Sequence, residues 1–217
     1  MRIEGQVGPV ATNASLSPSQ KDVAIRLGNM GEIIKSDLHG RYYEGSYRRA
    51  RFGGSMQAVL ATATIAGLST AVTGVSVLAN PINNTNNLVI EKVGLGFVLA
   101  PAAPLVYGIA TGQSANALAG TLTSLAPKSK LVGSSAQPTG LLYASAAITL
   151  PVAPTVDQVL GAIDTGAITT APTAPGGIFD LEGSIVLPPG GFACLWTSAV
   201  LLASAHIMSW QWEEVPI

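Results

Sequence analysis

Charged residues are scarce in this chain: only 11% of its 217 residues are Asp, Glu, Lys or Arg, where about 25% is usual for a soluble protein. The net charge of −1 gives no long-range attraction to nucleic acid or to an anionic membrane. A monomer with so few charges would expose a large uncharged surface. We therefore expect neighbouring subunits to cover part of that surface.

Cysteine and histidine are nearly absent, which excludes several kinds of site. The single Cys194 excludes an internal disulfide and a multi-cysteine zinc site, and its apolar neighbours predict a buried side chain. Only His39, in a predicted turn, and His206, in a predicted strand, could serve as the base of a nucleophilic triad. The chain contains no G-x-S-x-G, H-E-x-x-H or P-loop motif. We expect no metal, no cofactor and no catalytic residue.

Paired carboxylates of the glycosidase type have few candidates. Asp180 and Glu182 are spaced to share one face of a strand, a pattern that is also common at loop edges. Glu213 and Glu214 are adjacent, so they point to opposite faces of a strand and cannot form such a pair. We interpret Glu213 and Glu214 as solvated residues or as salt-bridge partners for an arginine near the amino terminus.

Signals for export and for membrane insertion are missing as well. No apolar segment follows Arg2, so we expect no signal peptide and synthesis in the cytoplasm. The uncharged stretch between Arg51 and Glu91 is interrupted by glycine and closes in asparagine-rich turn residues. Residues 192–210 are nearly long enough to span a bilayer, but they lack a basic flank and contain His206. We therefore expect no membrane span.

Short apolar segments separated by turn residues predict an all-β body. NLVIEKVGLGFVLAP predicts a strand of about ten residues. Residues 183–187 and the segment from Phe192 predict two strands joined as a hairpin by the turn Pro188-Pro189-Gly190-Gly191. In the last segment His206, Met208, Trp210 and Trp212 share one face, which we expect to cover the core. The preferred architecture is a jelly-roll β-sandwich.

The charged residues that do occur are concentrated near the amino terminus. Residues 1–51 hold eight of the 11 Lys and Arg and five of the 12 Asp and Glu. This shift predicts an extended amino-terminal arm, residues 1–54, with Gly53-Gly54 as the hinge to a body at residues 55–217. Ser17 and Pro18 could begin a helix, but Gly28 and Gly31 would weaken it, so a short helix and extended chain both stay open.

The segment RYYEGSYRRARFGG, residues 41–54, contains four arginines and four aromatic residues. Such residues contact nucleic acid, but they are equally enriched at the centres of protein interfaces. Asp37 and Glu44 dilute the positive charge, which favours the second interpretation. The residues expected to form contacts between subunits are Arg41, Tyr42, Tyr43, Tyr47, Arg48, Arg49, Arg51 and Phe52.

The chain from about Gly31 onward resembles a group of virion proteins of tailed bacteriophages. The segments that carry the resemblance are GEIIKSDLHGRYYEGSYRRARFGGS, LANPINNTNNLVIEKVGLGF, LPPGG and the final WQWEEVPI. The resemblance implies a non-enzymatic β-sandwich component of the particle that forms a homo-oligomer, often a trimer. It leaves head and tail positions open, and it does not extend to the first thirty residues.

Two functions follow as expectations. The first is a capsid decoration or cement protein, made in the host cytoplasm and located in the virion, where it contacts other copies and proteins such as the major capsid protein. The second is a tail or fibre-associated protein whose loops NPINNTNN or APTAPGG contact a host surface glycan. Exposed aromatic residues in those loops would favour the second function, and the sequence has none there.

Overall fold

The computed structural model divides the chain into two compact units, Met1–Glu44 and Gly45–Ile217. Every residue that it describes lies in the second unit. These residues form strands and turns without a helix, which confirms the all-β fold; none could therefore cross a membrane as a helix. The described residues are 51–55, 68, 70–72, 75–99, 101, 104–145, 147–163, 176–199 and 205–217.

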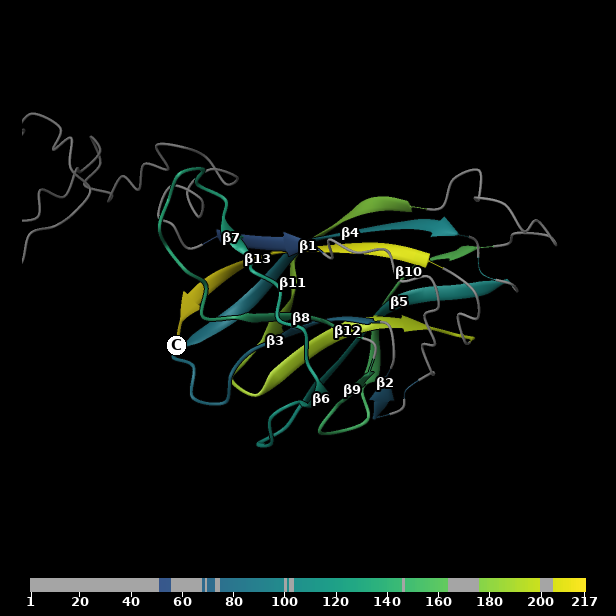
Figure 1. Ribbon diagram of the computed structural model, residues 1–217, viewed down its shortest axis with the longest axis horizontal. Coiled ribbons are helices and arrows are strands. Elements are labelled where there is room, and N and C mark those ends of the chain that lie inside the picture. Colours follow the sequence, from purple (N-terminus) through teal and green to yellow (C-terminus); the bar gives the residue numbers. More distant parts are fainter. Residues whose placement is uncertain are drawn as a thin grey trace, which may run out of the picture. The chain divides into compact units, whose positions relative to one another are not determined.

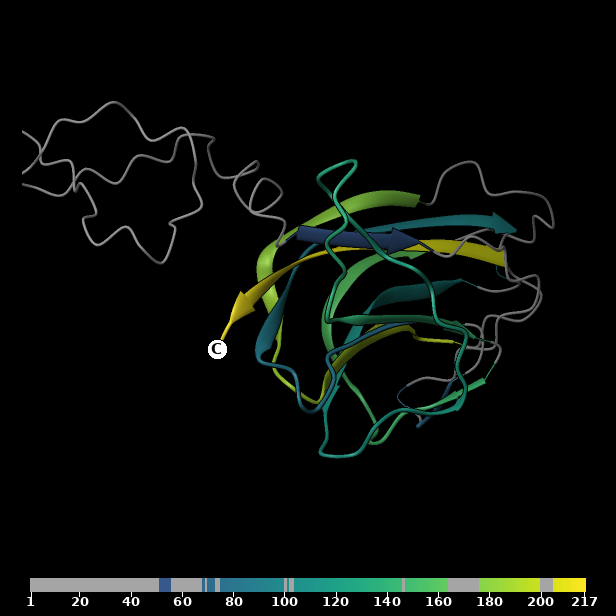
Figure 2. The same ribbon diagram turned by 60° about the vertical axis from the view of Figure 1, so that its left-hand side comes forward.

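Two antiparallel sheets pack face to face, with a small third sheet beside them (Figures 1 and 2). Sheet I consists, in spatial order, of β11 (Gly176–Leu187), β4 (Asn86–Leu99), β13 (Ala205–Pro216), β1 (Arg51–Ser55) and β7 (Lys128–Ser129). Sheet II consists of β10 (Thr155–Ile163), β5 (Leu105–Gln113), β12 (Gly191–Thr197), β3 (Val75–Ala79) and β8 (Leu141–Ser145). The small sheet consists of β2 (Ala71–Val72), β9 (Ala147–Thr149) and β6 (Ala119–Thr121).

The order of the strands is that of a jelly roll. The antiparallel pairs β1 with β13, β3 with β12, β4 with β11 and β5 with β10 form one folded ribbon. Along the chain these pairs alternate between sheet I and sheet II, so the ribbon rolls into a sandwich of two four-stranded sheets. β7 and β8 extend the two sheets at one edge. The predicted jelly-roll sandwich is therefore confirmed.

The core lies between the two sheets and follows the alternation expected for β13. His206, Met208, Trp210 and Trp212 are buried, while the residues between them are half-exposed. Trp210 also joins the sheets, because its Nε1 donates a buried hydrogen bond of 2.9 Å to Ser76 Oγ on β3. The strand predicted in NLVIEKVGLGFVLAP is present as β4, with 14 residues.

The predicted hairpin across Pro188–Gly191 is wrong, because its two strands belong to different sheets. β11 pairs with β4, and β12 pairs with β3 and β5. The side-chain amide of Asn80 donates to the Leu187 carbonyl at 2.9 Å, and Gly190 N donates to Asn80 O at 3.0 Å. These bonds hold the turn against the start of the asparagine-rich loop, so the chain crosses from sheet I to sheet II.

The predicted hinge at Gly53-Gly54 is also wrong, because both glycines lie inside β1. Gly53 is paired with Gln211 and Gly54 with Trp210 on β13. Each glycine has a packing reason: the aliphatic part of Lys130 lies against Gly53, and a Cβ on Gly54 would come within 2.8 Å of Leu142 Cδ2. The body therefore includes residues 51–54, and residues 1–50 of the expected arm lie outside the described residues.

Candidate functional site

The structure describes only two of the eight residues that were expected to contact other subunits. Arg51 and Phe52 lie in β1, and both are buried within their own chain. Neither is available as a surface contact, so the prediction is wrong for these two. The other six, which lie outside the described residues, are Arg41, Tyr42, Tyr43, Tyr47, Arg48 and Arg49.

Arg51 anchors β1 through an ion pair that the sequence did not reveal. Its guanidinium pairs with the carboxylate of Glu91 on β4. Gln211 Nε2 on β13 donates to the other Glu91 oxygen at 2.8 Å. One carboxylate therefore connects three neighbouring strands. On the opposite face of β1, the ring of Phe52 packs 6.3 Å from that of Trp212 in the core.

Glu214 is buried, which corrects its interpretation as a solvated residue. Its Oε1 accepts hydrogen bonds from Thr139 N at 2.8 Å and Gly140 N at 2.9 Å, and its Oε2 accepts one from the Thr139 hydroxyl at 2.7 Å. Trp212 Nε1 adds a fourth contact at 3.3 Å. This carboxylate ties the loop before β8 to the last strand of sheet I.

Replacing Glu214 with alanine should lower the free energy of unfolding by about 3 kcal/mol, because the buried N–H of Gly140 and the part-buried N–H and hydroxyl of Thr139 lose their acceptor. Urea unfolding measures the loss, and amide hydrogen exchange should speed up at Thr139 and Gly140. Glu213→Ala, on the half-exposed face of the same strand, is the matched control and should cost less. Equal costs for the two variants would contradict this account of Glu214.

The outer face of sheet I carries a patch of small and apolar residues that the sequence reading missed. On β4, Gly96 lies opposite Ile207 and Gly176, and Gly94 lies opposite Ser209 and Ile178. The alternate residues of β4 and β13, such as Leu95 and Trp210, point into the core. We call these six uncharged positions the glycine face: Gly94, Gly96, Gly176, Ile178, Ile207 and Ser209.

A hollow of about 400 Å³ opens on the glycine face. Gly53, Gly94 and Ser209 contribute to its lining, and Ile178, Lys92 and Lys130 also line it. Lys92 is paired with Asp180 at 3.0 Å. The arrangement is a centre of glycine and serine beside the exposed Ile178, with charged residues of both signs around it, and such a centre with a charged rim suits a protein interface.

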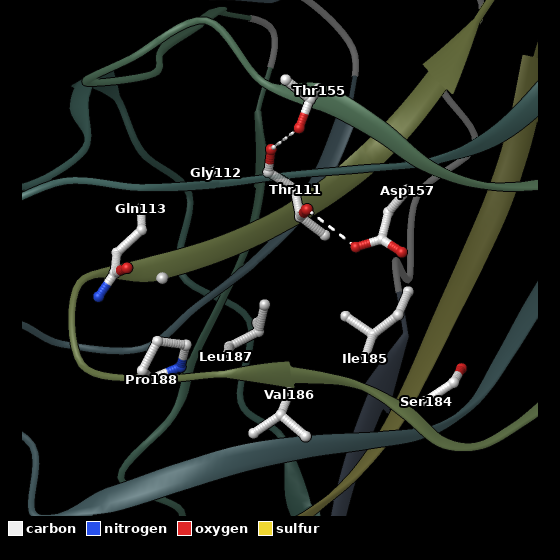
Figure 3. A pocket seen from close by; sticks show the side chains of 11 residues that line it. Thr111, Gly112, Gln113, Thr155, Asp157, Ser184, Ile185, Val186, Leu187 and Pro188 are labelled. Carbon is white, nitrogen blue, oxygen red and sulfur yellow. Dashed lines mark hydrogen bonds between the residues drawn. The ribbon is translucent and has the colours of Figure 1, made fainter.

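A second hollow, of about 480 Å³, lies where β10 at the edge of sheet II faces β11 at the edge of sheet I (Figure 3). The Thr111 hydroxyl donates to Asp157 Oδ2 at 3.1 Å, and the Thr155 hydroxyl donates to the Thr111 carbonyl at 3.5 Å. Gln113 and Ser184 add polar groups to the lining, beside the apolar Ile185. We call this hollow the edge groove; its hydroxyl, amide and carboxylate groups could hydrogen-bond a hydroxylated ligand.

Two side chains of the asparagine-rich loop, those of Asn80 and Asn84, form hydrogen bonds within the chain. Asn80 Nδ2 donates to the carbonyl oxygens of Asn86 and Leu187 at 2.8 and 2.9 Å. Asn84 Nδ2 donates to Asn80 Oδ1 at 2.6 Å and to Thr139 Oγ1 at 2.9 Å. These asparagines therefore stabilise the turn and its neighbouring loop. Of the second loop, APTAPGG, only its last two glycines belong to the described residues.

The remaining titratable candidates occupy structural positions. Asp180 pairs with Lys92 and also accepts a hydrogen bond from Glu182 N at 3.2 Å. Cys194 is buried in β12, as predicted, and burial raises the pKa of its thiol to about 12. Across the described part of the chain, no three His, Cys, Asp or Glu residues lie close enough together to hold a metal ion.

Comparison with known proteins identifies no relative of this chain. No protein-family model, no curated protein and no solved structure matches it.

Proposed function

We propose that the chain is a non-enzymatic structural subunit of a tailed-bacteriophage particle, most simply a capsid decoration or cement protein. The observation that carries the proposal is the glycine face, an uncharged patch on the outside of a sheet that is rigidly held from behind by the core. Such a surface suits contact with another protein. The jelly roll also occurs in viral capsid domains, which supports the proposal by analogy of fold alone.

The contacts that hold β1 in sheet I support the proposal, because they connect the preceding segment to the body. β1, which begins at Arg51, lies between β13 and β7 in sheet I. There the chain is held by the ion pair to Glu91 and by the packing of Phe52 on Trp212. Contacts that residues 41–49 make with neighbouring copies or with the major capsid protein would therefore be transmitted to the middle of the body. A homo-oligomer, with a trimer as the expected state, belongs to the same proposal.

Particles assembled without the chain test this function. They should still form, but they should release their genome at a lower temperature than complete particles, and added purified protein should restore the original temperature. Calorimetry or dye accessibility of the genome measures the release. Absence of the chain from purified complete particles, shown by mass spectrometry, would rule the proposal out.

The edge groove favours a second function, a tail or fibre-associated protein that contacts host glycans. Binding of purified protein to a glycan array, with an at least tenfold loss in Asp157→Asn, would support it. Glu182→Gln, which removes an exposed carboxylate outside the groove lining, is the control. If neither the array nor host-cell binding gives a signal above that of an unrelated jelly-roll protein, this second function is excluded.

A further inference from the structure

Glycine in the middle of a strand needs a reason, because it lowers stability by about 0.5–1 kcal/mol relative to alanine. Several strand glycines of this chain have an internal reason. A Cβ at Gly54 would collide with Leu142 and Pro127, and a Cβ at Gly108 would collide with the backbone of β10. In each case the close approach comes from within the same chain.

Gly96 has no such internal reason. A Cβ built there would meet no atom within 4 Å. At the neighbouring Gly94 a Cβ would collide with the hydroxyl of Ser209, a small side chain that would have to turn away, and would meet no other side chain. Among the described residues, the space above Gly96 is therefore not used by packing, and only the hydroxyl of Ser209 enters the space above Gly94. A surface kept clear in this way allows the backbone or side chains of another molecule to approach closely.

Ile178 supplies the counterpart of this space on the same face. Ile178 lies on β11, opposite Gly94 of β4, and is 78% exposed. Its neighbour Phe179 packs inward against Tyr107. Beside Ile178 lies the hollow of about 400 Å³, which is large enough to receive a side chain of this size. The glycine face thus carries both a projection and a recess.

A face with its own projection and recess can pair with itself, as the two sides of a twofold interface must. We infer that the glycine face is a contact between two copies of this chain, related by a twofold axis that runs along the strands between β4 and β13. Because sheet I has the order β11-β4-β13-β1, this axis places β11 of one copy over β1 of the other. Ile178 of each copy then lies over the hollow of its partner.

Charge and area agree with this arrangement. Asp180 lies on β11, and Lys130 lies against Gly53 on β1, so the same axis brings an acidic residue of one copy towards a basic residue of the other. Strands about 4.8 Å apart and about 3.3 Å per residue give the outer face of sheet I a projected area of roughly 600 Å². That is close to the roughly 800 Å² per partner of a standard interface.

The inference rests on the proposed function only in its expectation of a homo-oligomer. A twofold contact gives an oligomer of two chains, or of six chains if it joins two trimers. Size-exclusion chromatography with light scattering should therefore report two or six chain masses for the full chain. A mass of one or three chains would overturn the twofold contact, and three chains would still be compatible with the proposed trimer. A mass of two would support the contact while excluding the trimer.

Substitutions on the two outer faces locate the contact. Ile178→Asp should raise the dissociation constant at least tenfold, because it places a charge where an apolar side chain enters the hollow of the partner. Val159→Asp is the matched control, since Val159 is 59% exposed on β10 of sheet II. Unchanged association in Ile178→Asp, or an equal loss in Val159→Asp, would overturn the assignment of the face.

A cross-linking variant keeps the inference testable if Ile178→Asp fails to fold. Only residues near a twofold axis meet their own counterpart, and Ser209 on β13 lies beside the proposed axis. Ser209→Cys, a nearly isosteric change, should therefore form a covalent dimer with a short bifunctional maleimide. The native Cys194 is buried and gives little background. Val159→Cys should not cross-link, and failure of Ser209→Cys to do so would contradict the proposed axis.

Discussion

Trp210→Ala should lower the free energy of unfolding by about 3–5 kcal/mol, the largest stability loss that we expect from a single side chain in this protein. Trp210 is fully buried between the sheets, so alanine leaves a cavity. It also leaves the hydroxyl of Ser76 without its donor. Urea unfolding followed by circular dichroism measures the loss without relying on tryptophan fluorescence.

A double-mutant cycle separates the hydrogen bond from the volume of the ring. Ser76→Ala should cost about 1–3 kcal/mol, because Trp210 Nε1 is then buried without an acceptor. Trp210→Phe should cost a similar amount, and Ser76→Ala should add little once the indole N–H is gone. Strict additivity of the two variants would show that the bond between the sheets contributes no stability of its own.

Acidification from pH 6.5 to pH 4 should lower the free energy of unfolding by about 3 kcal/mol through His206 alone. This side chain is fully buried, and neither ring nitrogen has a hydrogen-bond partner in the described structure. Burial lowers the pKa of His206 to about 4 from the usual 6.5. Below pH 6.5 the unfolded chain therefore binds a proton that the folded chain excludes until about pH 4, and each pH unit in this window costs about 1.4 kcal/mol.

His206→Leu, which is close in volume and does not titrate, isolates this effect from that of the carboxylates. Unfolding free energies of the two proteins should be measured by urea titration at intervals between pH 4 and pH 8. Their difference should be constant above pH 7 and should shift by about 3 kcal/mol in favour of the leucine variant as the pH falls to 4. Parallel pH profiles would contradict the neutral, buried state of His206.

Alternation and turn chemistry were enough to predict the class of fold. The period of two along residues 206–212 correctly identified the core face of β13, and the apolar run after the asparagine cluster correctly located β4. The two errors are the hairpin predicted at Pro188–Gly191 and the hinge predicted at Gly53-Gly54. Each was predicted from the residue types of a short segment alone. Both depend on partners distant in the sequence: Asn80 for the turn, and Lys130 and Leu142 for the two glycines.

The candidate site was less predictable, and residue type explains why. Arginine and phenylalanine occur at interface centres, but they also fill interiors when a carboxylate or an aromatic ring is near. Glu91 lies 40 residues from Arg51 in the sequence, and the alternation of a short segment cannot reveal that pairing. The glycine face did leave a readable signal, because Gly94 and Gly96 alternate with the apolar Val93, Leu95 and Phe97. A strand whose outward positions are glycine indicates a surface that something approaches.

The position of β13 has a consequence for synthesis. It is the last strand along the chain, yet it occupies the middle of sheet I, with β4 on one side and β1 on the other. Until β13 has emerged from the ribosome, Phe52 lacks the ring of Trp212, and β4 lacks one of its two neighbouring strands. At about 5–20 residues per second, roughly 150 residues separate the emergence of β1 from that of its partner, a delay of about 8–30 seconds. During that interval β1 and β4 each present an apolar strand edge that only β13 can pair with, so a chaperone that binds such segments should associate with the nascent chain until β13 emerges.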